Sequence, residues 1–292
     1  MGSYPPDLPP EAQGPAFSGN GSTPEILPPA GSYMPPQQTA RKPRPMWAAA
    51  PATYLLLGIN CLVFIAMVAR HVSFLSPSPD DLLAFGANNA GAVLINGEWV
   101  RIVTAMFVHV GIIHLATNMW CLWNLGLLAE SLMGSGGVVA AYILSGAAGN
   151  LLSTLVSWYR FHGTAGGDGL FGPVGAGASG AVFGLAGVLI VLLKSPRLPI
   201  PQQELKGLRK SVIYFAAINL AIGLGTMMPG SIVHIDNMAH LGGFSCGLLF
   251  AMPLVPRIGS PRELFKVRRR IAVISMAVVL TLFAFFLRSF EL

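Results

Sequence analysis

Charged residues are scarce in this sequence, and their scarcity excludes an ordinary water-soluble domain. Only 10% of the 292 residues are Asp, Glu, Lys or Arg, whereas a soluble domain carries about a quarter. Hydrophobic residues make up 53% of the chain, and the mean hydropathy is +0.62. Together these values indicate that lipid, rather than water, surrounds most of the chain.

Cysteines are also few, and they do not form a disulfide framework. The three are Cys61, Cys121 and Cys246, which lie far apart in apolar stretches. An odd number at such spacing argues against paired bridges. We interpret all three as small buried hydrophobic side chains.

Residues 1–50 lack any apolar run, so we expect no secretory signal there. They are rich in Pro, Gly, Ser and Gln, a composition that has little to bury. The segment is therefore predicted to be a disordered tail. Its basic residues Arg41, Lys42 and Arg44 come just before the first apolar run.

Seven apolar stretches follow the tail, and helices are the default structure for each because lipid cannot satisfy free backbone groups. A spanning helix needs roughly 17–25 residues, so the fourth stretch is short. The strict alternation of a membrane barrel is absent. The sequence thus predicts an all-α polytopic membrane protein. The stretches cover about 52–68, 114–132, 138–156, 179–193, 212–228, 238–254 and 271–287.

The positions of the basic residues predict the orientation of these spans. Fourteen of the 18 Lys and Arg fall in three groups, which are Arg41–Arg44, Lys194–Lys210 and Arg257–Arg270. With seven spans, all three groups lie on one side, and the excess of positive charge makes that side cytoplasmic. The N-terminus is then inside, the C-terminus is outside, and the second, fourth and sixth spans begin at the outer surface.

Strongly polar residues inside spans are costly, so each is a candidate for function. They are His114 and Asn118 in the second span, Ser179 in the fourth and His240 in the sixth. All four lie near the predicted outer ends of their spans. His114 and Asn118 are four residues apart, so they share a helix face.

Ser179 and His240 have the chemistry of a nucleophile and its base. A serine hydroxyl becomes reactive when an adjacent base accepts its proton, and histidine suits that role near neutral pH. Glycine pairs follow each residue and let membrane helices approach closely. We therefore expect the fourth and sixth spans to pack together. The pairs are Gly180 with Gly184 and Gly243 with Gly247.

A hydrolase also needs hydrogen-bond donors for the developing oxyanion and access for water. Ser179 sits at a predicted helix start, where backbone N–H groups are free, and Asn118 and the His114 ring could add donors. The short fourth span, of about 22 Å if helical, suggests that it begins below the outer surface. Residues 163–177 would then dip inward and line a watered cavity.

At these residues the chain resembles the rhomboid family of intramembrane serine proteases. The resemblance covers about residues 51–254, and the last span is similar to the family's arrangement of six core helices plus one. Four motifs in matching order carry it. They are the GxSG-like Gly177-Ala178-Ser179-Gly180, the AHxxG-like Ala239-His240-Leu241-Gly242-Gly243, the HxxxN-like His114-Leu115-Ala116-Thr117-Asn118, and the Trp/Arg loop motif Trp99-Val100-Arg101.

The resemblance implies a Ser179/His240 dyad without cofactor or metal, and an oxyanion role for His114 and Asn118. It implies transmembrane protein substrates within the lipid bilayer, cleaved near their outer ends, and no nucleic-acid partner. The expected organisation is a tail (1–50), a six-helix catalytic core (51–254), and a basic loop with a seventh span (255–292). We expect the cell membrane as its location, because acidic residues and prolines in the tail are unlike a transit peptide.

Other interpretations of the same residues remain open at this point. Asp236 could orient His240, although a carboxylate stabilised by the helix start is favoured. His109 is interpreted as a polar contact of the loop, and Arg101 as a donor to loop carbonyls. The sequence has no HExxH string for a zinc protease. A catalytically silent, client-binding relative is the alternative function, and the intact Ser179 and His240 argue against it.

Overall fold

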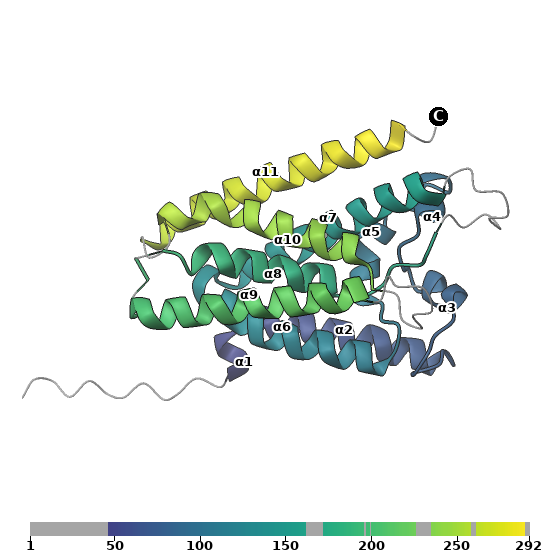
Figure 1. The fold of residues 1–292 in the computed structure, drawn as a ribbon, viewed down its shortest axis with the longest axis horizontal. Coiled ribbons are helices and arrows are strands. Elements are labelled where there is room, and N and C mark those ends of the chain that lie inside the picture. Colours follow the sequence, from purple (N-terminus) through teal and green to yellow (C-terminus); the bar gives the residue numbers. More distant parts are fainter. Residues whose placement is uncertain are drawn as a thin grey trace, which may run out of the picture. The chain divides into compact units, whose positions relative to one another are not determined.

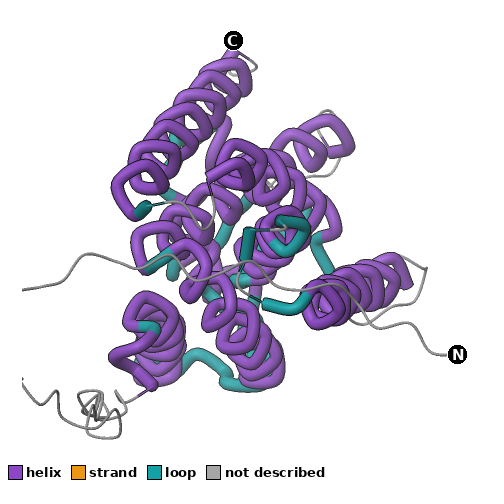
Figure 2. The backbone as a smooth tube through the Cα atoms, turned by 90° about the vertical axis from the view of Figure 1, so that its left-hand side faces the viewer, coloured by secondary structure: helices purple, strands orange, loops and turns teal. Residues whose placement is uncertain are grey.

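The computed structural model describes residues 46–161, 172–195, 197–198, 200–225, 235–257 and 261–289. This part of the chain consists of helices and connecting loops (Figure 2). Within it no β-strand forms, and one isolated bridge pairs Asn88 with Gly175. The prediction of an all-α fold is therefore confirmed.

Five of the described helices are long and apolar enough to cross a membrane (Figure 1). Each of these five helices contains one of the seven predicted apolar stretches. The fourth and fifth stretches lie in two further helices. The five are α2 (Pro51–Ala69), α6 (Ile112–Met133), α7 (Ser135–Phe161), α10 (Asn237–Ala251), which continues as the 3-10 turn η2 (Met252–Arg257), and α11 (Arg262–Arg288).

The two remaining predicted spans differ from this group for different reasons. The fourth stretch forms α8 (Ser179–Leu192), which is apolar but only 14 residues long. The fifth stretch lies in α9 (Gln202–Gly225), which begins ten residues before it. The added first turns carry Glu204, Lys206, Arg209 and Lys210, so the helix as a whole is less apolar. The count of seven spans stays a prediction.

Parts of three predicted segments lie outside the described residues. One is residues 1–45 of the expected tail, and the described chain begins with a short helix, α1 (Met46–Ala49), before α2. Residues 163–171 of the expected inward-dipping segment, and residues 226–228 of the fifth stretch, are also outside them.

Helix α8 lies at the centre of the bundle. It carries no polar face, and all its residues are buried except Ser179, Ile190 and Val191. A helix that is apolar all round is stable only when other elements surround it. Here α10 and α7 make its largest contacts, and α6 and α9 also pack against it.

Glycines bring α8 and α10 together with their backbones in contact. A methyl group on Gly243 would overlap the carbonyl oxygen of Gly180, and one on Gly247 would overlap that of Gly184. The matched order of these pairs shows that the two helices run in the same direction. The close packing expected from the small-residue pairs is therefore present.

The segment between α2 and α6, predicted to be a loop, is folded. It forms three short helices, α3 (Pro79–Ala84), α4 (Ala90–Leu94) and α5 (Arg101–Thr104), and the 3-10 turn η1 (Ala105–Phe107). Ser78 and Asp81 form a reciprocal cap at the start of α3. Helices of four to six residues show too little periodicity to be predicted from sequence patterns.

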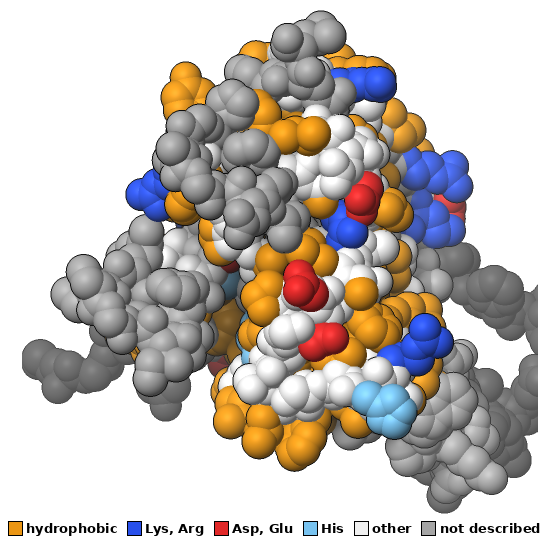
Figure 3. Space-filling model, turned by 90° about the vertical axis from the view of Figure 1, so that its right-hand side faces the viewer, with side chains coloured by type: hydrophobic (Ala, Val, Ile, Leu, Met, Phe, Trp, Pro, Cys, Tyr) orange, Lys and Arg blue, Asp and Glu red, His pale blue; other side chains and the backbone are white. Residues whose placement is uncertain are grey.

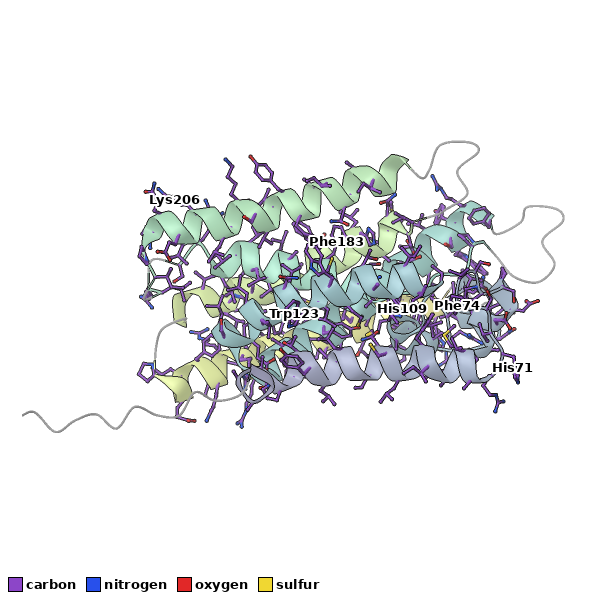
Figure 4. All side chains as sticks on the ribbon, turned by 90° about the horizontal axis from the view of Figure 1, so that it is seen from below. His71, Phe74, His109, Trp123, Phe183 and Lys206 are labelled. Atoms are coloured by element: carbon purple, nitrogen blue, oxygen red, sulfur yellow. The ribbon has the colours of Figure 1, made fainter. Side chains whose placement is uncertain are left out.

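The bundle has two chemically different ends. Lys206, in the basic first half of α9, marks one end in Figure 4, and His71, after α2, marks the other. At the Lys206 end, Arg269 near the start of α11 donates to the Met133 carbonyl at the end of α6 (2.7 Å). At the opposite end, the described surface shows acidic and basic side chains among hydrophobic ones (Figure 3).

Candidate active site

Ser179 is the first residue of α8, and the backbone before it is tightly constrained. Gly177 adopts a φ of +133°, a conformation that side chains with a Cβ rarely adopt. Its N–H donates to the carbonyl oxygen of Ala105 in η1 (3.0 Å). Ser179 therefore follows a constrained turn and begins a buried helix. The first backbone N–H groups of a helix have no intrahelical acceptor.

His240 lies in the first turn of α10 and is only 5% exposed. Its ring stacks on Phe183 at a centroid distance of 4.2 Å and an interplanar angle of 13°. Phe183 follows Ser179 by one turn on the same face of α8, and Gly180 lies against the Ala239 carbonyl. The structure thus brings the start of α8, which carries Ser179, next to the turn that carries His240.

His114 lies beside the turn at Gly177 that precedes Ser179. A methyl group on Gly177 would come within 2.5 Å of Cε1 and 3.0 Å of Nε2 of the His114 ring. The ring therefore faces the backbone just before Ser179, and its Nδ1 is buried without a partner among the described residues. This position is compatible with the predicted role of the His114 ring as a hydrogen-bond donor to the oxyanion.

Asn118 is 5% exposed and lies one turn further along α6. Its Nδ2 donates to the carbonyl of His114 (2.9 Å), which is a bond within its own helix. An amide nitrogen has two hydrogens, so one donor remains for another acceptor. In this structure Asn118 thus braces the His114 turn.

Asp236 uses both carboxylate oxygens away from the His240 ring. One oxygen accepts from the Ala239 N–H (2.9 Å) and caps the start of α10, and the other accepts from the Ser153 hydroxyl of α7. Nδ1 of His240 is buried without a hydrogen-bond partner among the described residues. In this structure the carboxylate therefore caps α10 and makes no hydrogen bond to Nδ1 of His240.

Trp99 and Arg101 hold the folded segment before α6. The Arg101 guanidinium donates to the carbonyls of Leu83 (2.6 Å) and Ala87 (3.0 Å) and pairs with Glu98. Trp99 packs near α7 and α11 and lines an apolar cavity of about 350 Å³. Both side chains lie in the scaffold around the site.

Several residues that sequence reasoning set aside or missed also lie here. Phe183 was missed, although its spacing of four from Ser179 places it on the same helix face. His109, interpreted as a loop contact, is fully buried beside the His114 ring, with ring centroids 5.3 Å apart. No local pattern links Ser153 to Asp236, since they lie 83 residues apart.

The arrangement supports one kind of chemistry among the side chains present. The components of nucleophilic acyl transfer are a serine at a helix start, a buried histidine in the adjacent turn of the neighbouring helix, and nearby N–H donors. Within the described ranges, no cluster of three or more His, Cys, Asp or Glu residues could hold a metal ion. His162, Asp168 and His234 lie outside those ranges.

Comparison with known proteins gives several related chains. Rhomboid protease GluP of Bacillus subtilis (strain 168) is 31% identical over 209 residues, which cover 71% of this chain and 36% of that protein. RHOMBOID-like protein 6, mitochondrial, of Arabidopsis thaliana is 34% identical over 197 residues, covering 68% and 57%. Rhomboid protease AarA of Providencia stuartii is 28% identical over 201 residues, covering 66% and 70%. The chain therefore spans less than two thirds of the length of the first two relatives.

The sequence also matches the Rhomboid domain over residues 96–257, which is more than half of the chain. This range includes α6, α7, α8, α9 and α10, together with all four motifs identified in the sequence. The spanning helices and this match make the protein an integral, multi-pass membrane protein. The chain belongs to the rhomboid family.

Proposed function

We propose that this protein is an intramembrane serine endopeptidase that uses a Ser179/His240 dyad. The observation that carries the proposal is the packing of α8 on α10, which places the start of one beside the first turn of the other. Two relatives bear the name rhomboid protease, which supports the same activity. No other described serine shares this combination of helix start and neighbouring buried histidine.

The proposed reaction begins when the Ser179 hydroxyl attacks the carbonyl carbon of a peptide bond. His240 accepts the hydroxyl proton as the new C–O bond forms, and the carbonyl oxygen becomes an oxyanion. The Ser179 backbone N–H, the His114 ring and the Asn118 amide are the proposed donors to it. His240 then gives its proton to the leaving amine, and water hydrolyses the acyl-enzyme by the same steps in reverse.

Two features of the site suit this reaction inside a membrane. Phe183 covers one face of the His240 ring and limits its orientation. Both oxygens of Asp236 are used elsewhere, so in the proposal His240 acts as the base without a carboxylate bonded to its ring. In the proposal, Ser179 and His240 therefore carry out the proton transfers without a third residue.

The substrates in this proposal are transmembrane helices of other proteins, cleaved near their outer ends. The proposed orientation has the N-terminus in the cytoplasm and the C-terminus outside, in the cell membrane. It rests on the basic residues of α9 and of the start of α11, which gather at the bundle end marked by Lys206. The site at the start of α8 then faces the outer half of the bilayer.

The test is cleavage of a model single-span substrate by purified protein, with wild type, Ser179→Ala and His240→Ala compared at equal folded concentration. We expect cleavage by wild type and a loss of at least a thousandfold in both variants. Cleavage by Ser179→Ala would show that another group is the nucleophile. An inert wild type, tried on several substrates, would favour the client-binding alternative.

A further inference from the structure

His109 is a fully buried histidine whose two ring nitrogens both have partners. It follows η1 in the chain and precedes α6, and its side chain is fully buried (Figure 4). Nδ1 lies 3.3 Å from the carbonyl oxygen of Phe107, and Nε2 lies 3.4 Å from the backbone nitrogen of Ala178. Since a carbonyl only accepts and a backbone N–H only donates, Nδ1 carries the proton and Nε2 accepts.

The Ala178 N–H belongs to the peptide unit between Gly177 and Ala178, one residue before the peptide that joins Ala178 to Ser179. The preceding N–H, of Gly177, donates to the Ala105 carbonyl (3.0 Å). Two successive N–H groups of the serine turn are therefore held by one short stretch, residues 105–109. The next N–H in the chain is that of Ser179, which is one of the proposed oxyanion donors.

Stretch 105–109 is itself anchored to α7. The hydroxyl of Tyr142 donates to the Met106 carbonyl within the stretch (3.3 Å), and the Asn150 amide donates to the Ile102 carbonyl of α5, just before it (2.9 Å). Both of these side chains are buried. A rigid helix thus supports the stretch that fixes the serine turn, which is the arrangement that a preorganised site requires.

We infer that His109 is a positioning residue for the proposed nucleophile, because its Nε2 holds the Ala178 N–H and so orients the peptide that leads into Ser179. The inference rests on the proposed function and deepens it. Sequence reasoning treated His109 as a loop contact, whereas here it is the ring acceptor of the serine turn. The role requires a neutral ring with a fixed tautomer.

The surroundings of the ring keep it neutral. Burial, and then the neighbouring His114, lower the pKa of His109 from 6.5 to about 3, while the bond to Phe107 opposes this change. A protonated ring would present two N–H groups and would lose the acceptor for Ala178. At pH 5 and above the acceptor is therefore present in nearly all molecules.

Two substitutions test the two hydrogen bonds of His109 individually, because each keeps one bond and removes the other. In His109→Gln, the amide oxygen reaches the position of Nε2 and keeps an acceptor for the Ala178 N–H. In His109→Asn, the shorter amide reaches only the position of Nδ1 and keeps the Phe107 contact. The readouts are the labelling rate of Ser179 by a fluorophosphonate probe, and kcat and KM for a model single-span substrate, each normalised to folded protein.

We expect His109→Gln to retain both rates within about threefold, and His109→Asn to lose roughly ten- to a hundredfold in kcat and labelling, with KM unchanged. A purely structural role would lower the unfolding temperature of both variants and leave the rates of folded protein unchanged, which would overturn the inference. Equal losses in both variants would also overturn it. If wild type itself is neither labelled nor active, the proposed function fails instead.

A second measurement needs no substitution of His109. Selective ¹⁵N-histidine spectra of the protein, assigned by replacing the other five histidines in turn, report the tautomer of each ring. We expect His109 to be neutral and protonated on Nδ1, without change between pH 5 and pH 8. A ring protonated on Nε2, or one that titrates in this range, would contradict the inference even if both variants fail to fold.

Discussion

Asp236 offers the clearest test at the scale of single residues, because its two oxygens cap α10 and bind Ser153. In Asp236→Asn, the amide oxygen can still accept from the Ala239 N–H. We therefore expect cleavage to fall by less than about tenfold, whereas loss of a triad carboxylate costs about 10⁴-fold in kcat. Steady-state cleavage of a model substrate measures the difference. A loss near 10⁴-fold in folded protein would indicate that Asp236 acts on His240.

Glu130 of α6 is a second residue whose role the contacts define. It is 4% exposed, and its carboxylate accepts four bonds, from the Ala52 and Thr53 backbone N–H groups and from the Thr53 and Ser135 hydroxyls. The carboxylate thus caps the start of α2 from another helix.

We expect Glu130→Gln to lower the free energy of unfolding by about 2–4 kcal/mol, because an amide NH₂ would face groups that donate. Thermal unfolding in detergent measures the change. Glu263→Gln is the control, since Glu263 is exposed and pairs with Lys266 on the surface. Equal unfolding temperatures for the two variants would refute the capping role.

The sequence predicted polar residues at the site more readily than apolar ones. Ser179, His114 and His240 could be selected because polar groups inside spans are costly and therefore rare. Phe183 could not be selected, since one more aromatic in an apolar helix has no such signal. His109 falls between these cases, because its partner Ala178 is a backbone group 69 residues away.

At the scale of elements, the contact between α8 and α10 depends on the absence of side chains. A Cβ on Gly247 would overlap the carbonyl oxygen of Gly184. Gly247→Ala should therefore push the helices apart, destabilise the protein by about 1–3 kcal/mol and reduce cleavage together with Ser179 labelling.

The matched control is Gly58→Ala in α2, where a Cβ would meet no atom within 4 Å. This change should leave the unfolding temperature unchanged or raise it slightly, by up to about 1 kcal/mol in free energy. Unfolding curves and cleavage rates of the two variants are compared directly. A tolerated Gly247→Ala would mean that the helices are not held at backbone contact.

Helices were predictable to the extent that they are long and apolar. The apolar stretches located α2, α6, α7 and α10 within a few residues, because lipid-exposed runs need that length. They missed the charged first turns of α9 and α11, which extend each helix beyond its apolar part. The short helices between α2 and α6 depend on tertiary hydrogen bonds, such as those of Arg101, which sequence patterns do not reveal.

At the scale of the whole molecule, the proposed orientation places His71 outside the cell and Lys206 inside it. Each residue is exposed and marks one end of the bundle (Figure 4). In intact cells, a membrane-impermeant maleimide should label His71→Cys and should leave Lys206→Cys unlabelled until the cells are lysed. Wild type, whose three cysteines lie in helices α2, α6 and α10, gives the background. The opposite labelling pattern would invert the orientation.

Covalent labelling of the nucleophile tests whether His240 activates Ser179. Wild type, Ser179→Ala and His240→Ala would be treated with a fluorophosphonate, and the modified residue would be located by mass spectrometry of peptides. We predict one adduct, on Ser179, in wild type, none in Ser179→Ala, and a labelling rate at least a hundredfold lower in His240→Ala. An adduct on another residue, or unchanged labelling in His240→Ala, would refute the Ser179/His240 dyad.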